Sequence, residues 1–459
     1  MKVGPGTVIA GRFELRSHAA AGGMGSVFLA HDLKSARQVA IKLLLRDGAE
    51  DVVRFEREAD LLATVQHPNV VEYIAHGESD GVYYLAQEWV DGLTVSAQMR
   101  TLGVTAPEAI ALAIGVADAL DAAHSAGVVH RDVKPSNIIL AGNALSEPRL
   151  VDFGVARMAE AAGVLTRTGV MIGTPAYMSP EQCRGQTYID AAADVWSLGC
   201  VLYECLTGRS PFTGATATAS RAKVLLGEPS PLRQFCAEAN DELVQLTSEL
   251  LAKHPGDRPA CGGDAAARLR ALPAMHAGPR RKSQRLSTPH PAQGLKTPRV
   301  DAQALVQANS YVLVTPQGTN PSAVEEDDRR LGAIADRMGM KLDLLEDGTA
   351  VLTSRDAGKA GALAAARVAM QIRAEVWEDA AVTVFGRAYD DDVTDAIERG
   401  AALLEQSHMA MTFGGVVEDA TPVIHVDDVI AELVADEIPI ERGPDGPAIK
   451  GDVKRMTRT

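Results

Sequence analysis

The segments HRDVKPSN, residues 130–137, and LVDFGVAR, residues 150–157, decide the fold of this chain. Two short strand-like runs, IIL and RLV, lie between them, and this pattern predicts a hairpin. The hairpin would gather polar side chains at one end, namely Asp132, Lys134, Asn137 and Asp152. An unrelated turn has no need of two acids, an amide and an amine at this separation. The two segments therefore predict a chemical site.

The groups on this hairpin match the requirements of phosphoryl transfer. The reaction needs an oxygen base near the attacking hydroxyl, a cation on the moving phosphoryl group and oxygen ligands for magnesium. Asp132 would accept or orient the hydroxyl proton, and Lys134 would reach the phosphate. The metal ligands would be Asn137 and Asp152. We interpret His130 as a packing residue rather than as the base.

A glycine-rich run, SHAAAGGMGSVFLA, precedes these segments at residues 17–30. It fits the pattern of a loop that wraps a phosphate chain at Gly22, Gly23, Gly25 and Val27. Ala20 occupies the first glycine slot, where a methyl group is tolerated if φ stays negative. We expect weaker or slower nucleotide handling at worst, not its loss. A glycine-rich run alone also fits an ordinary turn, which is the alternative interpretation.

A lysine inside an apolar strand supports the nucleotide interpretation. Lys42 lies in QVAIKLLL, residues 38–45, where burying its charge is costly without an anionic partner. The partner would be a nucleotide phosphate or a carboxylate from the helical stretch at residues 50–65. There we prefer Glu58 to Glu56, because Glu58 shares a face with the leucines of the helix. An exposed edge-strand lysine and a surface glutamate are the alternative.

From about residue 8 to 272 the chain resembles the catalytic domain of bacterial serine/threonine protein kinases of the eukaryotic (Hanks) type. Further motifs agree: GTPAYMSPEQ (173–182) resembles a substrate-docking segment, and DVWSLGCVLYECLTGRSPF (194–212) a buried anchoring helix. HPGDRP (254–259) supplies Arg258, which in the family pairs with the residue matching Glu181. The resemblance implies an α+β, bilobal fold with a β-rich N-lobe over about 8–90 and a helical C-lobe over 91–272. It also implies ATP, Mg²⁺ or Mn²⁺, and protein serine or threonine hydroxyls as acceptors.

The resemblance assigns roles in the nucleotide site. Lys42, held by Glu58, would contact the α and β phosphates, under the glycine-rich loop. The cofactor-binding residues beside adenine would be Ala40, Gln87, Glu88 and Val90. Gln87 occupies the gatekeeper slot, which is more often hydrophobic. KPSN together with Thr174 resembles the serine/threonine-directed subclass rather than the tyrosine-directed one.

The segment between Asp152 and Glu181 is expected to carry regulation. Thr166 and Thr168 lie where related bacterial kinases autophosphorylate, and Arg131 is the cation that a phosphothreonine would pair with. Polar loop residues without a regulatory role are the alternative. Secondary candidates in the basic region that follows are Ser283, Ser287 and Thr288, for which solvated linker residues without a regulatory role are the preferred interpretation.

Composition divides the rest of the chain. Residues 273–304 are rich in Pro, Arg, Lys, Ser and Thr and predict a flexible basic linker, because such a segment buries too little apolar surface to offset the entropy of ordering. Residues 305–440 regain strands and alanine-rich helices, are acidic, and predict a separate α/β domain. We expect a disordered tail over residues 441–459. The predicted kinase domain comprises residues 1–272.

The element order of the C-terminal domain faintly resembles a ferredoxin-like class III nucleotide cyclase homology domain. Catalytic cyclases need two metal-binding aspartates, one of them in the first strand. That strand here reads SYVLVTPQG and contains no acid, so a dimerisation or ligand-sensing role is expected instead. The cluster Asp390, Asp391 and Asp392 is expected to be a solvated turn rather than a cation site.

Charge and cysteine content limit the partners. A net charge of −15 disfavours nonspecific nucleic-acid or anionic-membrane binding. No apolar run approaches the ~20 residues that span a bilayer, and the N-terminus lacks a signal-peptide core, so we expect a cytoplasmic protein. The five cysteines show no CxxC pairing and predict reduced thiols. Homodimers occur in the kinase family, and no residue here requires one.

Three functions from different classes are compatible with these patterns. An active protein kinase is the main interpretation. A pseudokinase scaffold would lack Lys42, Asp132 or Asp152, and none of them is missing. A cyclase or ligand-binding sensor would place the chemistry in the C-terminal domain.

Overall fold

The computed structural model describes ten stretches of the chain, which are residues 3–22, 25–44, 49–153, 175–284, 305–316, 324–345, 347–388, 392–413, 423–443 and 446–449. The chain forms two compact units. Unit 1 comprises Met1–Gln182, Gln186–Pro211 and Pro229–Arg285, and unit 2 comprises Cys183–Gly185, Phe212–Glu228 and Leu286–Thr459.

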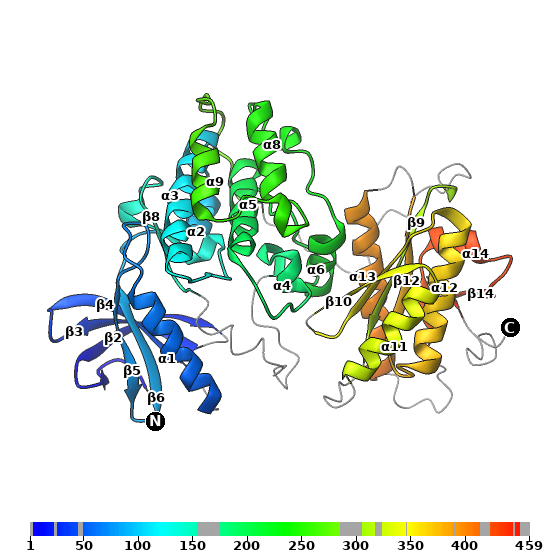
Figure 1. Ribbon diagram of the computed structural model, residues 1–459, viewed down its shortest axis with the longest axis horizontal. Coiled ribbons are helices and arrows are strands. Elements are labelled where there is room, and N and C mark those ends of the chain that lie inside the picture. The colour runs from blue at the N-terminus through cyan, green and yellow to red at the C-terminus, as the bar shows by residue number, and fades with distance from the viewer. Residues whose placement is uncertain are drawn as a thin grey trace. The chain divides into compact units, whose positions relative to one another are not determined.

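Unit 1 begins with a six-stranded antiparallel sheet in the order β1-β2-β3-β4-β6-β5 (Figure 1). Its strands are β1 (Val8–Ile9), β2 (Phe13–Gly22), β3 (Gly25–Asp32), β4 (Arg37–Leu44), β5 (Tyr73–Ser79) and β6 (Val82–Glu88), and helix α1 (Ala49–Ala63) lies between β4 and β5 in sequence. Alternation along β4 buries Val39, Ile41 and Leu43 in the core of this lobe. The opposite face therefore carries Ala40 and Lys42.

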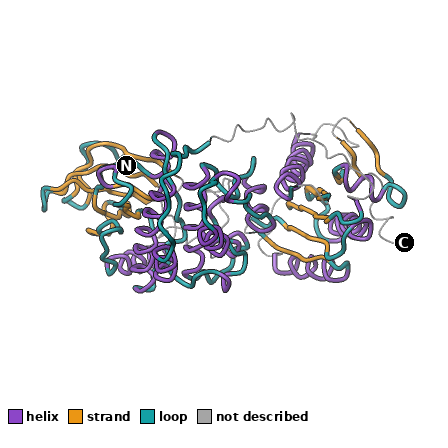
Figure 2. Tube along the Cα trace, turned by 90° about the horizontal axis from the view of Figure 1, so that it is seen from above, coloured by secondary structure: helices purple, strands orange, loops and turns teal. Residues whose placement is uncertain are grey.

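The rest of unit 1 is mainly helical, and Figure 2 shows its helices apart from the strands of the first lobe. The elements are α2 (Val95–Thr101), α3 (Ala106–Ser125), β7 (Ile138–Leu140), β8 (Pro148–Leu150), α4 (Pro180–Cys183), α5 (Ala191–Thr207), α7 (Leu232–Phe235), α8 (Asp241–Leu250) and α9 (Gly262–Arg270), of which α4 ends at the border with unit 2. Helix α5 is buried along almost its whole length and forms the centre of the lobe. Asp190 caps its N-terminus, and Gly208 ends it at φ 75° in the left-handed region.

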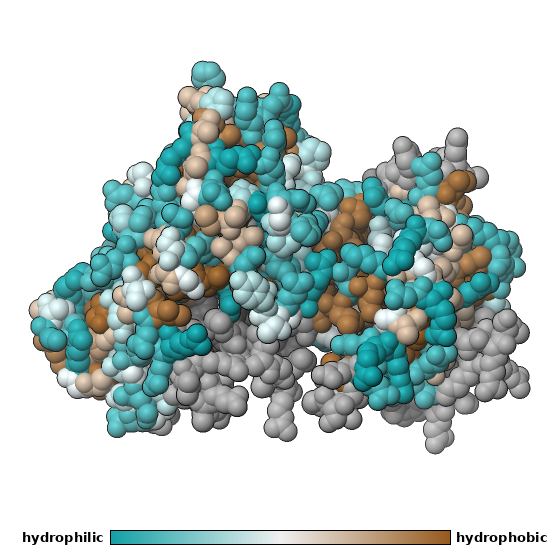
Figure 3. All heavy atoms as spheres, in the orientation of Figure 1, coloured by the Kyte–Doolittle hydropathy of each residue, from teal (hydrophilic) through white to brown (hydrophobic). Residues whose placement is uncertain are grey.

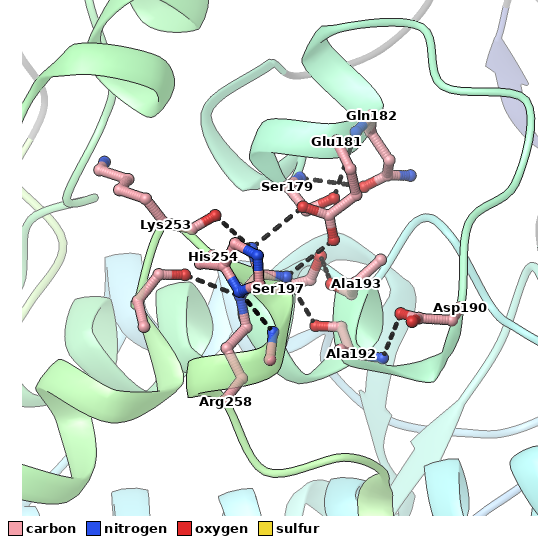
Figure 4. Close-up of polar contacts among 12 residues, drawn as sticks. Ser179, Glu181, Gln182, Asp190, Ala192, Ala193, Ser197, Lys253, His254 and Arg258 are labelled. Atoms are coloured by element: carbon pink, nitrogen blue, oxygen red, sulfur yellow. Dashed lines mark hydrogen bonds and ion pairs between the residues drawn. The ribbon is translucent and has the colours of Figure 1, made fainter.

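A buried ion pair joins two distant segments of the helical lobe (Figure 4). The guanidinium of Arg258 donates to both carboxylate oxygens of Glu181, at 2.7 and 3.0 Å. It also donates to the carbonyl oxygens of Ala192, Ala252 and Lys253. The predicted partnership of Arg258 with Glu181 is thereby confirmed, and the guanidinium has the partners that a buried cation needs.

The predicted linker does not begin as free chain. Residues 279–284, which we name the strap, are hydrogen-bonded to the helical lobe. Arg281 exchanges two backbone hydrogen bonds with Val104, at 2.8 and 3.0 Å. Its basic composition predicted a solvated tether. Instead, Arg280 and Arg281 donate hydrogen bonds to acidic side chains and backbone carbonyls of the helical lobe. Residues 285–304 of the predicted linker lie outside the described residues.

Unit 2 contains a seven-stranded sheet in the order β10-β11-β9-β12-β13-β15-β14. Its elements are α6 (Ala217–Leu226), β9 (Asn309–Thr315), α11 (Val324–Arg337), β10 (Met340–Leu344), β11 (Ala350–Ser354), α12 (Gly358–Glu375), β12 (Ala381–Arg387), α13 (Val393–Phe413), β13 (Ile424–Val426), α14 (Asp428–Val434), β14 (Ile440–Gly443) and β15 (Gly446–Ile449). Helices α11, α12 and α14 share an apolar core with one face of the sheet. Helix α13 packs on the other face, where Gly400 leaves room for the ring of Phe385.

Strands β9 to β13 and helices α11 to α14 lie in the region 305–440, where the sequence predicted strands and helices. The prediction of a disordered tail from residue 441 is wrong over its first part, because β14 and β15 form a hairpin there. Strand β15 pairs with β13, so the edge strand β13 gains a hydrogen-bonding partner and Ile449 is buried. Residues 450–459 lie outside the described part of the chain.

Two segments predicted in the kinase domain pack within unit 2. Helix α6 lies against α13, and the Lys223 ammonium donates to a Glu398 carboxylate oxygen at 2.6 Å. In the same unit the Arg184 guanidinium donates to Asp343 at 2.7 Å. Of the predicted acidic cluster, only Asp392 is described, and its carboxylate accepts the Thr394 amide at 2.8 Å, next to the start of α13.

The surface is predominantly polar on the face of the helical lobe that Figure 3 shows. The exposed large apolar side chains among the described residues are scattered: Val8, Leu33, Leu61, Leu102, Tyr188, Val306 and Val324. Within the described ranges, no helix combines the length and apolar character needed to cross a membrane.

Candidate active site

The predicted hairpin is present and brings its two motifs together. Strand β7 pairs with β8 in antiparallel register, with Ile138 opposite Leu150. The amide of Val151 donates to the carbonyl of Asn137 at 3.0 Å and extends this pairing by one step. Asn137 and Asp152 therefore lie at the same end of the hairpin, as the sequence predicted.

Asp132 is the centre of a polar cluster at that end. Its Oδ2 accepts hydrogen bonds from the Lys134 ammonium at 2.7 Å and from the Asn137 amide at 2.9 Å. The Asn137 amide also donates to the backbone carbonyl of Asp132 at 2.9 Å. The side chains of Asp132 and Lys134 are about one-fifth exposed, so a substrate can reach both.

His130 is a structural residue, as the sequence interpretation required. It is fully buried, and its ring lies against Phe153 with 4.5 Å between the ring centroids. The Asp132 amide donates to Nδ1, so Nε2 carries the proton and donates to the Val151 carbonyl at 3.0 Å. Burial lowers the pKa of His130, which keeps the ring neutral at physiological pH. A neutral ring with both nitrogens occupied does not act as the base.

Asp194, which the sequence reasoning did not single out, fixes the backbone of the segment that leads into Asp132. This buried carboxylate in the first turn of α5 accepts the backbone amides of His130 and Arg131, both at 2.7 Å. His124 Nε2 contacts it at 2.9 Å. Arg131 has a φ of 64°, a conformation that residues with a side chain adopt at a cost and that these bonds maintain. An acid in the first turn of a predicted buried helix was the available signal.

Lys42 meets Asp152 across the lobes, with its ammonium 2.9 Å from a carboxylate oxygen. Burial acts to raise the pKa of Asp152, but attraction and hydrogen bonding from Lys42 outweigh it, so that this pKa is lowered. Asp152 is therefore ionised at neutral pH. Its φ of 58° places it, like Arg131, in the left-handed region, as is common at functional sites.

The sheet face that bears Lys42 also bears three of the predicted nucleotide-binding residues, Val27, Ala40 and Gln87. Cross-strand pairing puts Val27 beside Lys42, and Ala40 between Leu29 and Gln87. Ala20 lies in β2, opposite Val27, and is not among the residues with positive φ, so its methyl group is tolerated as predicted.

The glycine turn and the end of β6 complete this side of the site. Gly22 pairs with Gly25, whose φ of 141° suits only glycine. Glu88 ends β6, and Val90 follows it in a half-buried position.

Several predicted residues are beyond what the structure describes. Gly23, Thr166, Thr168 and Thr174 lie outside the described residues. Glu58 belongs to α1, but the structure does not describe its side chain. Its pairing with Lys42 therefore stays a prediction. On the same helix Leu62 is buried, whereas Leu61 is 38% exposed, so only part of the face assigned to Glu58 is apolar core.

The buried side chain of Gln87 has an amide nitrogen that lacks a hydrogen-bond partner among the described residues. The residue is 6% exposed. An unsatisfied buried donor costs free energy on folding. Replacing Gln87 with leucine is therefore expected to raise the free energy of unfolding by about 1–3 kcal/mol.

Thermal unfolding of the wild type and the Gln87→Leu variant tests this expectation. The matched control is Gln245→Leu, because the Gln245 amide on the exposed side of α8 bonds to Glu249 at 2.9 Å. We expect the control to shift stability by no more than about 0.5 kcal/mol. A lower midpoint for Gln87→Leu than for the wild type would contradict the account.

The oxygen donors at the hairpin fit a hard divalent cation. Asp152 offers an ionised carboxylate and Asn137 a side-chain amide oxygen, and magnesium prefers such ligands together with phosphate oxygens. The described residues contain no cluster of three His, Cys, Asp or Glu suited to a metal. In phosphoryl-transfer sites, the phosphate oxygens of the nucleotide complete the coordination of such a cation.

A strand-rich lobe with a lysine on its inner face, joined to a helical lobe with paired acids on a hairpin, defines a class of phosphoryl-transfer proteins. Comparison of the sequence with known families agrees, since the family described as "Protein kinase domain" matches residues 13–267. The chain belongs to the protein kinase family.

Relatives of known name are similar to this part of the chain. Serine/threonine-protein kinase PknB of Mycolicibacterium smegmatis is 40% identical over 256 residues, which cover 54% of this chain and 40% of the relative. A probable serine/threonine-protein kinase of Corynebacterium efficiens is 39% identical over 280 residues, which cover 58% of this chain and 42% of the relative. The chain thus spans less than half the length of these relatives. The crystal structure of the Mycobacterium tuberculosis PknI kinase domain aligns with a TM-score of 0.48 at 28% identity, covering 59% of this chain and 98% of that one.

Proposed function

We propose that this chain is a serine/threonine protein kinase that transfers the γ-phosphoryl group of ATP to protein hydroxyls. The observation that carries the proposal is the convergence of Asp132, Lys134 and Asn137 with the Lys42–Asp152 pair in unit 1. Relatives at about 40% identity bear the name serine/threonine-protein kinase. A pseudokinase scaffold is not favoured, because the acids and lysines of the site are present and connected.

Each residue has a distinct role in the proposed reaction. Asp132 orients the acceptor hydroxyl and receives its proton, and Lys134, already hydrogen-bonded to Asp132, offsets charge on the transferring phosphoryl group. Lys42 would bind phosphate oxygens of ATP, and Asp152 and Asn137 would hold magnesium or manganese. The metal ion neutralises charge on the phosphates when it is bound.

We also propose activation by autophosphorylation at Thr166 and Thr168. The Arg131 backbone is anchored on both sides, by Asp194 at its amide and by the Gln182 side chain at its carbonyl at 2.9 Å. An arginine fixed in this way is a suitable partner for a phosphothreonine.

For the C-terminal part we propose a regulatory domain similar to a class III cyclase homology domain. Strand β9 carries no acidic residue, so a ligand-sensing or dimerisation role is proposed rather than cyclase chemistry.

The test is phosphate transfer from radiolabelled ATP to a generic basic protein by the purified chain, with Mg²⁺, with Mn²⁺ and with chelator. We expect metal-dependent label on phosphoserine and phosphothreonine, and mass spectrometry should find phosphate on Thr166 or Thr168. ATP binding without transfer would instead support the scaffold. Transfer to the basic protein with both threonines unmodified would remove the activation proposal alone.

A further inference from the structure

The strap is attached to the ends of two helices of the helical lobe. Besides the Arg281 pairing with Val104, the Ser283 amide donates to the Met99 carbonyl at 3.0 Å. The Gln284 amide donates to the carbonyl of Gly208 at 2.8 Å. These bonds place the strap along the end of α2 and the end of α5, outside residues 13–267 that match the kinase family.

Side chains and glycines fit the strap closely to this surface. The Arg281 guanidinium is 10% exposed and donates to the Glu238 carboxylate at 2.6 Å and to the Phe235 carbonyl at 2.9 Å. A β-carbon at Gly208 would lie 2.4 Å from the carbonyl oxygen of Lys282, so only glycine permits this approach. The strap is therefore closely packed against the helical lobe, as segments within a folded domain are.

Ser283 connects the strap to the substrate side of the lobe through one carboxylate. Its hydroxyl donates to Glu204 Oε1 at 3.4 Å, and the Tyr177 hydroxyl donates to Glu204 Oε2. Glu204 is 8% exposed, and burial raises its pKa against the effect of these two donors. Tyr177 belongs to the segment at residues 173–182 that resembles a substrate-docking segment. Two hydroxyls thus share a buried acid, one on each side.

We propose that the strap is a releasable latch and that Ser283 is a phosphorylation site whose modification keeps it released. The proposal rests on the proposed kinase function, because the chain itself would supply the phosphate from ATP. A bond forms between Ser283 Oγ and the γ-phosphorus, the bond from that phosphorus to the β,γ-bridging oxygen breaks, and ADP leaves with the electron pair. The hydroxyl proton passes to Asp132 and then to solvent.

The charge of a phosphate on Ser283 would prevent the modified strap from returning. The docked hydroxyl is a donor to a buried carboxylate, whereas a phosphate is an acceptor with up to two negative charges. Of the neighbouring cations, Arg281 is occupied by Glu238 and Phe235, and Lys282 is exposed to solvent. When the strap is released, Glu204 loses the hydrogen bond from Ser283, and we expect Tyr177 to be held less firmly. The KM for protein substrate should then rise, whereas the KM for ATP should change little.

Mass spectrometry and amide hydrogen exchange on the full chain test the proposal. Incubation with Mg-ATP should place phosphate on Ser283. In the Ser283→Glu variant, exchange of the Gln284 and Val104 amides should speed up by about 10- to 100-fold, because a second carboxylate placed beside the buried Glu204 repels it. Ser283→Ala keeps the backbone bonds and should exchange nearly as the wild type does. Ser287→Glu adds the same charge four residues further on and serves as the matched control.

The outcomes separate this inference from the proposed function. Transfer to a basic protein without phosphate on Ser283 overturns the modification site and leaves the kinase function standing. Unchanged exchange in Ser283→Glu overturns the latch, whatever the activity. Equal acceleration in Ser287→Glu also overturns it, because the effect would then follow from charge alone. Absence of all labelling overturns the kinase function and the self-modification together.

Discussion

Replacing Asp132 with asparagine is expected to slow phosphate transfer by about 10²- to 10⁴-fold, the usual contribution of a positioned general base. Asparagine is similar in size and keeps an oxygen for Lys134, but it cannot take up the hydroxyl proton. The Asp132 carboxylate is held by Lys134 at 2.7 Å and by Asn137 at 2.9 Å, so the variant should keep its fold and its affinity for ATP.

The measurement is single-turnover transfer to a basic protein, together with nucleotide binding followed by fluorescence. The control is Asp118→Asn, which changes an acid of α3 that is paired on the surface with Arg270. The control should transfer phosphate at the wild-type rate. If Asp132→Asn stays within about tenfold of the wild type, the assignment of the base is wrong, because such a loss falls below the range for a general base.

Replacing Arg258 with alanine is expected to lower the free energy of unfolding by about 3–5 kcal/mol. The guanidinium is inaccessible to solvent, and its removal leaves the Glu181 carboxylate, 5% exposed, as a buried charge without its cation. Three backbone carbonyls lose their donor at the same time. The cost therefore arises mainly from desolvated groups left behind rather than from the attraction lost.

Chemical denaturation followed by circular dichroism measures this loss. Arg268→Ala is the matched control, since Arg268 pairs with Glu249 in the same lobe but is half exposed. A surface pair of this kind contributes no more than about 1 kcal/mol. Similar losses in the free energy of unfolding for the two variants would show that the buried ion pair contributes no more to stability than the surface pair.

The sequence predicted the catalytic hairpin because the hairpin is local. Asp132, Lys134 and Asn137 lie within six residues of one another, and β7 and β8 join them to Asp152 through a short loop. Chain connectivity alone nearly fixes such a cluster. The same holds for the elements of the C-terminal domain, whose strands and helices follow directly from hydrophobic periodicity.

The errors fall where a segment takes its partners from distant parts of the chain. The strap was predicted as part of a flexible linker from its basic composition, yet the Arg281 side chain is only 10% exposed and is hydrogen-bonded to Glu238 and Phe235. Residues 441–449 were predicted as tail, but β13 offered them an unpaired edge. The composition of a segment reflects only that segment, so it cannot show which distant residues of the folded chain the segment will contact.

By itself the sequence determined the chemistry: the types and spacing of the hairpin residues, the lysine of β4 and the family to which they belong. Only the tertiary structure decided how that chemistry is assembled. It pairs Lys42 with Asp152 across 110 residues and fixes the backbone of His130 and Arg131 on the buried Asp194. The physical reason is that spacing fixes contacts only over a few residues. Over longer separations, the packing of whole elements decides which charges meet and which are buried.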